Sequence, residues 1–234
     1  SFIVSTDSIY LFTKQWVSEK TALYSLSKYP GVHVANYKAE LDVSGLITGA
    51  YHNRSKKLVV LSGYSSYVQP FFYLLYDFSG NDFFSGNKRK ISFSSSFHQV
   101  EGVTSNDNLT YYATNEKLVK IITIKQKLHE IDLSTYLNSH LSSIIEDLNS
   151  PEILSSHLDT VFYVDNNCSI IMPDFTADIQ ATDDITSPEN LIFTQTPYCG
   201  QLLNKGVYDV KLRAYDEYDN FHEVSFSLEV LDTI

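Results

Sequence analysis

The sequence contains little of what several classes of protein require. Its longest apolar stretch, PFFYLLYDF at 70–78, has the length of a strand and falls well short of the roughly 20 apolar residues that a membrane-spanning helix needs. Lys and Arg number 17 against 28 Asp and Glu, which gives a formal net charge of −11. Because an acidic surface repels phosphate backbones, we expect neither a membrane span nor a nucleic-acid partner.

Methionine, tryptophan and cysteine are also scarce. One Met and one Trp stand beside 17 Tyr and 14 Phe, a balance that favours β structure because Tyr and Phe suit pleated, half-buried surfaces. The two cysteines, Cys168 and Cys199, are too few to form a metal site of their own. They either form one disulfide in an exported protein or remain two free thiols, and the sequence leaves both alternatives open.

A repeat of about 50 residues occupies the first part of the chain. Three similar segments, DSIYLFTKQW, KKLVVLSGY and DNLTYYATNE, begin at Asp7, Lys56 and Asp107, and two further strand-like runs follow each of them. Short strands that recur with this period are typical of β-propeller blades. We therefore predict about three propeller-like blades over 1–137; a β-sandwich with accidental self-similarity is the alternative.

Three blades cannot close a propeller, which needs at least four. The chain also begins at Ser1 rather than Met, without a charged leader followed by an apolar run. We expect the chain to be part of a larger protein, or its other blades to have been lost. A partner chain or domain would then cover the exposed edges of the propeller.

The segment 138–162 is predicted to be a partly helical connector. Leu141, Ile144, Ile145 and Leu148 recur at the spacing that places them on one face of a helix. The proline at position 151 would end that helix, because the residue before a proline disfavours the helical conformation.

The remaining segment, 163–234, alternates apolar and polar residues. The alternation is strict in GVYDVKLRAY (206–215) and FHEVSFSLEVL (221–231), which predicts two half-buried antiparallel strands. The DEYDN sequence between them predicts a tight turn. Further short strands are expected at 169–172, 179–182 and 191–195. Together these strands indicate a small Ig-like β-sandwich, so the predicted fold class is all-β.

These residues resemble the hyalin-repeat (HYR) family of Ig-like domains. MPDFTADIQATDD at 172–184, the TQTP turn at 194–197 and the closing AYDEYDN hairpin carry the resemblance, which extends from Cys168 to about Leu231. The first part of the chain is similar, more loosely, to the propeller-like regions that precede such repeats in bacterial secreted surface proteins. Some of those proteins are exported by type IX secretion. The resemblance implies an extracellular adhesion module.

The chain departs from the HYR pattern in ways that place the family disulfide in doubt. Ile185 and Val224 stand where HYR domains often carry cysteine, and Cys199 matches no family position. Asp219 stands where the family usually has glycine, a position that Asp can occupy at modest strain.

One candidate ligand site lies between two of the predicted blades. His98, Gln99 and Glu101 occur together in FHQVEG, and the innermost strands of a propeller surround a channel. These three side chains could therefore bind a ligand or a cation. The alternative is that Glu101 only accepts backbone hydrogen bonds at a turn.

One candidate metal site lies on two turns of the predicted sandwich. Asp183, Asp184, Asp216 and Asp219 could share a calcium ion if both turns are at the same end, since calcium takes six to eight oxygen ligands. The HYR resemblance implies no calcium requirement, and turn formation alone is the alternative. Calcium is the one cofactor that the sequence suggests.

We predict a secreted or cell-surface protein without enzymatic activity. Propeller loops would recognise a protein or a glycan, and the sandwich would serve as a spacer or an adhesion module. Two alternatives remain open. The chain could be a component of a larger surface or secretion assembly, or a propeller hydrolase with a channel site around Glu101.

Overall fold

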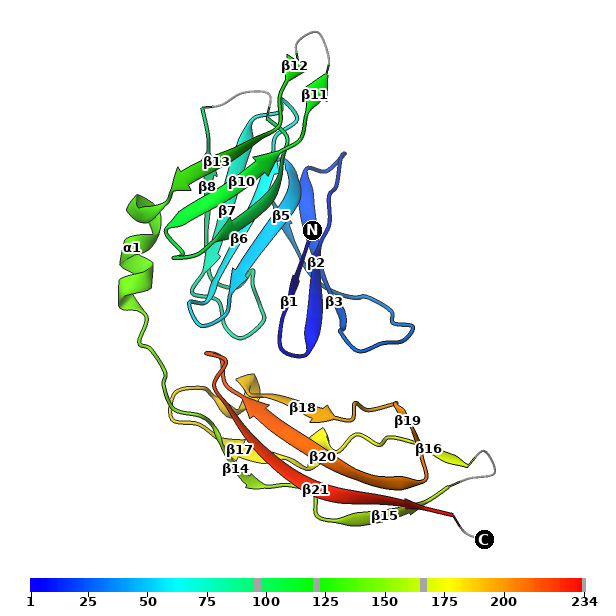
Figure 1. The fold of residues 1–234 in the computed structure, drawn as a ribbon. Coiled ribbons are helices and arrows are strands. Elements are labelled where there is room, and N and C mark those ends of the chain that lie inside the picture. Colours follow the sequence, from blue (N-terminus) through cyan, green and yellow to red (C-terminus); the bar gives the residue numbers. More distant parts are fainter. Residues whose placement is uncertain (95–97, 120–122, 165–167, 233–234) are drawn as a thin grey trace. The chain divides into compact units, whose positions relative to one another are not determined.

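Two compact units, 1–145 and 146–234, make up the chain in the computed structural model. Within the described residues the chain is all-β apart from one α-helix and two short 3-10 turns, as the composition predicted (Figure 1). None of the helices among these residues is long and apolar enough to cross a membrane. The residues that the structure describes are 1–94, 98–119, 123–164 and 168–232.

The first unit contains three antiparallel sheets, and each of the first two is built from strands that follow one another in the chain. Their orders are β1-β2-β3-β4, β5-β6-β7-β8 and β9-β10-β13. A separate hairpin, β11 with β12, extends from the third sheet (Figure 1). The strands are β1 (Phe2–Val4), β2 (Ser8–Phe12), β3 (Lys20–Ser27), β4 (Asn36–Asp42), β5 (Leu46–Asn53), β6 (Leu58–Tyr64), β7 (Pro70–Tyr76), β8 (Asn87–Ser92), β9 (Val100–Ser105), β10 (Thr110–Asn115), β11 (Leu118–Val119), β12 (Thr123–Ile124) and β13 (Lys127–Asp132).

The predicted repeat is visible in this order of strands. The three similar segments form β2, β6 and β10, and each of these is the second strand of its sheet. The third repeat departs from the other two, because the described residues of the run 117–124 do not pair with β10. Its described residues form the β11–β12 hairpin, while 120–122 lie outside the described residues, and the next run supplies β13 instead.

The second sheet is the middle layer of the first unit. Every residue of β6 is buried, and the two faces of this strand belong to different cores. Val59 and Leu61 pack with residues of the first sheet, whereas Leu58 and Val60 pack with residues of the third. Burial on both faces explains why this strand is a continuous apolar run rather than an alternation.

The first strands of the three sheets are neighbours, because β5 contacts both β1 and β9. The hydroxyl of Thr48 on β5 donates a hydrogen bond to the carbonyl oxygen of Val100 on β9. A Cβ added at Gly49 would lie 2.6 Å from the carbonyl oxygen of Glu101. Glycine at this position therefore permits the close approach of the two backbones.

The described α-helix, α1 (Ser134–Ser143), begins and ends earlier than the sequence predicted. His140 is its most C-terminal buried residue. The backbone of Ile144 is already extended, and the side chains of Ile145 and Leu148 are 73% and 83% exposed. The predicted helical face over 141–148 is therefore wrong. Apolar residues at helical spacing favour a helix only when that face packs against a core, and Ile145 and Leu148 do not.

The second unit contains one four-stranded sheet and two two-stranded sheets. The larger sheet has the order β15-β21-β20-β18, with β15 parallel to β21 and the other pairs antiparallel. The first two strands of the second unit come from the segment predicted to be a connector: β14, which pairs with β17 in a two-stranded sheet, and β15. The elements are β14 (Glu152–Ser155), β15 (Thr160–Tyr163), β16 (Ser169–Ile171), η1 (Thr176–Asp178), β17 (Gln180–Thr182), η2 (Pro188–Asn190), β18 (Ile192–Thr196), β19 (Leu202–Asn204), β20 (Gly206–Tyr215) and β21 (Phe221–Leu231).

The alternation predicted for the C-terminal hairpin is confirmed. Val210, Leu212 and Ala214 of β20 are fully buried, as are Leu228 and Val230 of β21. Three residues of MPDFTADIQATDD are buried in the same core: Met172, Phe175 and Ile179.

The two cysteines, Cys168 and Cys199, are exposed and do not form a disulfide with each other.

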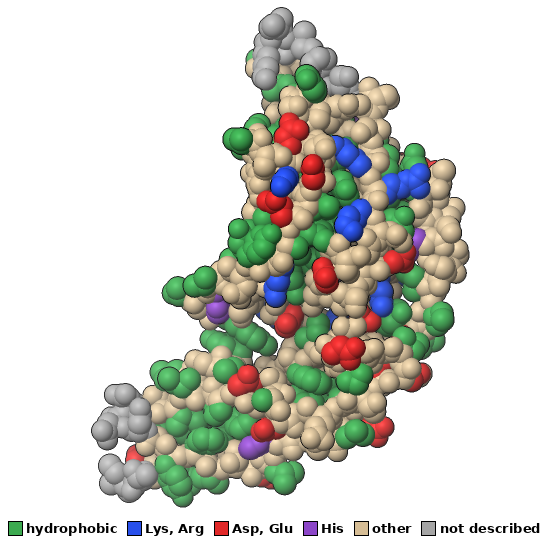
Figure 2. Space-filling model, turned by 180° about the vertical axis from the view of Figure 1, so that it is seen from behind, with side chains coloured by type: hydrophobic (Ala, Val, Ile, Leu, Met, Phe, Trp, Pro, Cys, Tyr) green, Lys and Arg blue, Asp and Glu red, His purple; other side chains and the backbone are tan. Residues whose placement is uncertain are grey.

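Charge is divided unequally along the chain. Of the 28 acidic residues, 17 lie in 146–234, against three of the 17 basic residues. The second unit therefore has a formal charge of −14, from 17 acidic minus three basic residues. Figure 2 shows basic side chains gathered on the first unit. A unit with this excess of carboxylates attracts cations from solution.

Candidate metal centre

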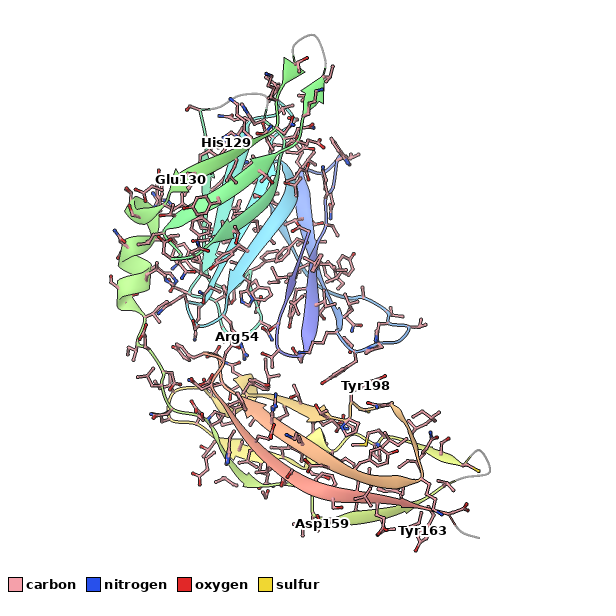
Figure 3. The ribbon with its side chains drawn as sticks, viewed as in Figure 1. Arg54, His129, Glu130, Asp159, Tyr163 and Tyr198 are labelled. Atoms are coloured by element: carbon pink, nitrogen blue, oxygen red, sulfur yellow. The ribbon has the colours of Figure 1, made fainter. Side chains whose placement is uncertain are left out.

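The three predicted ligand-binding residues do not line one site. His98 borders a cavity of about 220 Å³ between the second and third sheets, and its ring meets that of His129 edge-on with the centroids 5.1 Å apart. His129 and Glu130, which also line this cavity, lie on β13 (Figure 3). Gln99 lines a different cleft, of about 300 Å³, and Glu101 borders neither of the two.

Glu101 is nevertheless in an unusual environment for a carboxylate. It lies on β9, and burial raises the pKa of its side chain, while the positive charge of Lys14 acts in the opposite direction. A raised pKa is common to catalytic carboxylates and to carboxylates that are merely half-buried. The raised pKa of Glu101 therefore does not by itself define a catalytic site.

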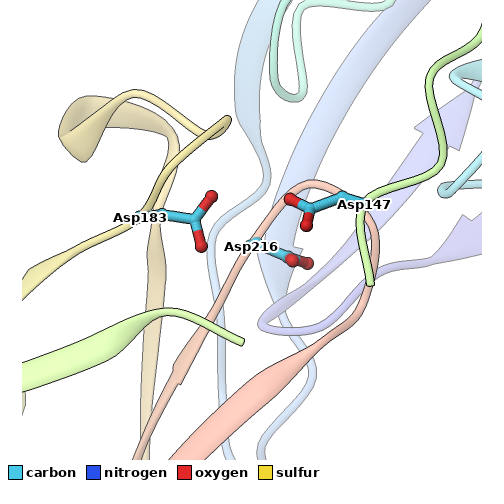
Figure 4. A group of neighbouring side chains, drawn as sticks. All are labelled: Asp147, Asp183 and Asp216. Atoms are coloured by element: carbon cyan, nitrogen blue, oxygen red, sulfur yellow. The ribbon is translucent and has the colours of Figure 1, made fainter. Parts of the chain in front are cut away.

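Three aspartates of the second unit do come together (Figure 4). Asp147 precedes β14, Asp183 follows β17 and Asp216 follows β20. One carboxylate oxygen of each lies within 4.8 Å of those of the other two. We call this group the acidic cluster. It combines residues that are far apart in the sequence, and the turns around each residue explain how it is positioned.

Asp216 organises the turn between β20 and β21. One of its carboxylate oxygens accepts hydrogen bonds from the backbone N–H groups of Tyr218 and Asn220, both at 2.8 Å. The other oxygen accepts one from the side-chain amide of Asn220 at 2.7 Å. Asp219 has a φ of 71°, the left-handed conformation that Asp tolerates better than most residues. The DEYDN turn thus holds the Asp216 side chain in one orientation.

Asp183 organises the turn that follows β17. Its Oδ2 accepts hydrogen bonds from the backbone N–H groups of Ile185 at 3.0 Å and Thr186 at 2.7 Å. The hydroxyl oxygen of Thr186 in turn accepts one from the backbone N–H of Glu217 at 3.2 Å. This contact links the Asp183 turn directly to the Asp216 turn.

Asp147 belongs to a short segment that is bonded to both turns. Its Oδ1 accepts a hydrogen bond from the backbone N–H of Asn149 at 3.0 Å. Its carbonyl oxygen accepts one from the side chain of Asn220 at 2.9 Å. The side chain of Asn149 donates to Asp184 Oδ2 at 2.9 Å. The segments that carry Asp147, Asp183 and Asp216 are therefore linked by hydrogen bonds that do not involve the carboxylate oxygens of these three residues.

Two carboxylate oxygens of the acidic cluster are buried without a hydrogen-bond partner among the described residues, Oδ2 of Asp147 and Oδ1 of Asp183. Asp147 is only 5% exposed and Asp216 is fully buried. A buried carboxylate oxygen that lacks a partner costs considerable free energy, because water no longer solvates it. A bound cation would provide the missing partner for both oxygens.

Burial and mutual repulsion affect the protonation of the cluster. Burial raises the pKa of Asp147, and the neighbouring charges of Asp183 and Asp184 raise it further. Burial likewise raises the pKa of Asp216, with a smaller contribution from the charge of Asp147. Both carboxyl groups therefore hold their protons more readily than free aspartate does, unless a positive charge is close by.

The donor atoms of the cluster fit a hard cation. All are carboxylate oxygens, which suit Ca²⁺ and Mg²⁺, whereas zinc and copper prefer the nitrogen and sulfur ligands that the cluster lacks among the described residues. Three carboxylates supply up to six of the six to eight oxygens that calcium takes. The larger and more adaptable Ca²⁺ suits an irregular site built from three turns better than Mg²⁺, which demands octahedral geometry.

The sequence located part of this cluster. Asp183 and Asp216 were both candidates, but Asp184 bonds to Asn149 instead, and Asp219 is exposed and is not one of the three clustered aspartates. Asp147 was missed because it was placed in the predicted connector. The signal that points to Asp147 is its place two residues before Asn149, a spacing that favours a local turn-forming hydrogen bond, shortly before Pro151 and β14.

No family model and no curated protein matches this chain.

Proposed function

We propose that the chain is a calcium-binding, non-enzymatic binding protein of the cell surface or the secreted fraction. The first unit would present its loops for recognition of a protein or glycan. The second would be an HYR-like Ig domain that serves as a spacer or adhesion module. The acidic cluster carries the calcium part of this proposal, through the two buried carboxylate oxygens that lack a partner.

The stacking of the sheets supports the propeller-like part of the proposal. Each of the first two sheets is a four-stranded meander, the second sheet packs between the first and the third, and their first strands are neighbours. Blades of a β-propeller have this arrangement, with the first strands towards the central axis. An incomplete set of blades would leave sheet faces for a partner to cover.

The chemistry of the acidic cluster also favours a location outside the cell. Sites in extracellular modules bind calcium with dissociation constants of about 10⁻⁴ to 10⁻³ M, because calcium is abundant there. A site of three carboxylates on irregular turns belongs to this weaker class. The formal charge of −14 on the second unit would add a general attraction for cations.

The hydrolase alternative receives no comparable support. His98 and Gln99 open to different cavities, and Glu101 borders neither of them. General acid–base catalysis needs the two groups within reach of one reacting bond. We therefore do not propose a reaction.

A calcium titration of the metal-stripped full chain tests the proposal. Calorimetry should show one bound Ca²⁺ with a dissociation constant of about 10⁻⁴ to 10⁻³ M, and weaker binding of Mg²⁺. Asp183→Asn should weaken binding at least tenfold. Asp209→Asn is the matched control, because it removes the same charge from an exposed position of β20. Equal binding by both variants, or no binding by the unaltered chain, would show that the cluster is not a calcium site.

The proposed location has a separate test. Protease treatment of intact cells that produce the protein should degrade it when it is displayed on the surface, and a secreted protein should appear in the medium. Full protection inside intact cells would refute the surface assignment and leave the calcium result unaffected.

A further inference from the structure

We propose that the first unit binds a saccharide in the cleft around Trp16. This inference rests on the proposed function because it names a ligand for the binding role proposed for the first unit. The acidic cluster takes no part in it. The cleft has a volume of about 300 Å³. Trp16, Glu19, Tyr64, Ser65, Val68 and Gln99 line it, and it is called the Trp16 cleft below.

Trp16 is the only tryptophan of the chain, yet its side chain is 66% exposed. Tryptophan is among the side chains that gain most from burial, and it is highly buried on average. An exposed indole at the edge of a cleft offers a flat apolar face. The C–H groups on one face of a pyranose ring stack well on such a surface, while the sugar hydroxyls point to the sides.

Polar side chains surround the indole at positions that suit those hydroxyls. Glu19 accepts hydrogen bonds, Gln99 donates and accepts them, and the hydroxyl of Ser65 does both. Sugar hydroxyls need donors and acceptors of this kind at the rim of an aromatic surface. The cleft volume is at the lower end of the range for small-molecule sites, which suits a short saccharide rather than a large cofactor.

Lys14 holds the aromatic groups of the cleft in place. Its ammonium group lies 5.0 Å from the ring centroids of both Trp16 and Tyr64. It also donates a hydrogen bond to the Tyr64 hydroxyl oxygen at 2.9 Å. The side chain of Gln99 donates to that same oxygen at 3.3 Å. A site whose residues are already bonded to one another loses less entropy when a ligand binds.

Two residues that line the cleft have strained backbones. Glu19 has a φ of 54° and Val68 a φ of 60°. Positive φ is a genuine outlier for a β-branched residue such as valine. Residues held in such conformations gather at functional sites, where surrounding structure imposes them. The presence of two of them in the loops of one cleft is an observation independent of the exposed indole.

The charge of the cleft selects among ligand classes. The carboxylate of Glu19 lines the cleft and the ammonium of Lys14 lies against Trp16 and Tyr64, so charges of both signs are present, which favours neither a phosphate nor a strongly cationic peptide. A purely apolar ligand would leave the carboxylate and amide groups without partners. An uncharged saccharide satisfies both the indole face and the polar rim.

The experiment applies the full chain, in calcium-containing buffer, to a printed array of neutral oligosaccharides that includes glucans, mannans, xylans and chitooligosaccharides. A hit is then titrated by tryptophan fluorescence. Because the chain has one tryptophan, its emission reports on the Trp16 cleft alone. We expect a saturable change in the emission of Trp16 upon binding.

Two variants and a control locate the binding. Trp16→Ala should weaken the affinity for the array hit about tenfold or more, and Gln99→Ala should weaken it severalfold. Tyr67→Ala is the matched control, since Tyr67 is 85% exposed on the neighbouring β6–β7 loop and does not line the cleft. It should retain affinity within about twofold. Affinities of the Trp16 variant are measured by calorimetry, and circular dichroism checks that each variant is folded.

Absence of binding to every glycan on the array overturns the proposal, and so does a hit whose affinity Trp16→Ala leaves unchanged. These failures are separable from a failure of the proposed calcium site. A chain that binds Ca²⁺ but no saccharide refutes only the Trp16 cleft, whereas a chain that binds a saccharide at Trp16 without binding Ca²⁺ refutes only the acidic cluster.

Discussion

Replacement of Asp147 by asparagine should have opposite effects on stability with and without calcium. The substitution keeps the size of the side chain and an oxygen that can accept the hydrogen bond from the Asn149 backbone. It removes one negative charge from the acidic cluster and one anionic ligand for the ion. Without calcium we expect the variant to be more stable than the unaltered chain, and with calcium less stable.

The spacing of the acidic cluster sets the magnitude. Its carboxylate oxygens lie within 4.8 Å of one another, and two unit charges at that separation repel by about 3 kcal/mol at an effective dielectric constant of about 20. Asp147→Asn removes two of the three repulsive pairs. In the unaltered chain, partial protonation of the carboxylates already reduces much of this repulsion. We therefore expect Asp147→Asn to raise the free energy of unfolding by about 1–2 kcal/mol without calcium.

Calcium reverses the order of stability by mass action. At a free concentration 100 times the dissociation constant, a ligand that binds only the folded state adds about 2.7 kcal/mol. For a domain the size of the second unit, this corresponds to a rise in melting temperature of about 10–20 °C. The variant should gain only a small fraction of this rise, because the remaining two carboxylates bind the ion weakly.

Differential scanning calorimetry of the full chain, in chelator and in CaCl₂ at about 100 times the dissociation constant found by titration, measures both effects. Asp209→Asn serves again as the control for net charge. Equal melting-temperature shifts upon calcium addition for Asp147→Asn and Asp209→Asn would refute the reasoning. So would a variant that is less stable than the unaltered chain in chelator.

Further predictions concern pH, packing and the cysteines. The pKa values of Asp147 and Asp216 are raised in the folded state. Without calcium, the free energy of unfolding should therefore fall as the pH rises from the pKa of Asp in an unfolded chain, about 3.9, through the pKa values of the folded state. Calcium competes with these protons, so its stabilising effect should shrink when melting curves are recorded at decreasing pH across that window. Gly49→Ala should cost about 1–3 kcal/mol in urea unfolding, because the added Cβ would lie 2.6 Å from the Glu101 carbonyl oxygen; an unchanged midpoint would contradict the close packing of β5 and β9. Alkylation without reductant should add two labels to the intact mass, since both cysteines are exposed and unbonded, and no labelling would indicate a disulfide.

The sequence predicted those elements whose own residues determine their structure. The C-terminal hairpin is one, because strict alternation leaves a strand only one face to bury, and Val210 and Leu228 are on that face. The repeat in the first unit is another, since β2, β6 and β10 each occupy the second place in their sheets and the first two sheets form from consecutive strands. In both cases local pattern and tertiary packing demand the same conformation.

The elements that were misplaced depend on contacts far along the chain. Ile145 and Leu148 have helical spacing but find no core, so the segment after α1 is extended and its aspartate at position 147 joins turns that lie much later in the sequence. Periodicity cannot show which turns meet at one end of a sheet. The acidic cluster could therefore be predicted at Asp183 and Asp216 from their turn chemistry, but its third member required the fold.

Crystals grown with calcium provide the most direct test of the acidic cluster as a cation site. We expect one anomalous scattering peak with calcium–oxygen distances of about 2.3–2.6 Å to the carboxylates of Asp147, Asp183 and Asp216. We also expect that Oδ2 of Asp147 and Oδ1 of Asp183, which have no hydrogen-bond partner among the described residues, are both ligands. Ordered carboxylates with no peak between them, or calcium bound elsewhere in the second unit, would show that the acidic cluster is not a calcium site.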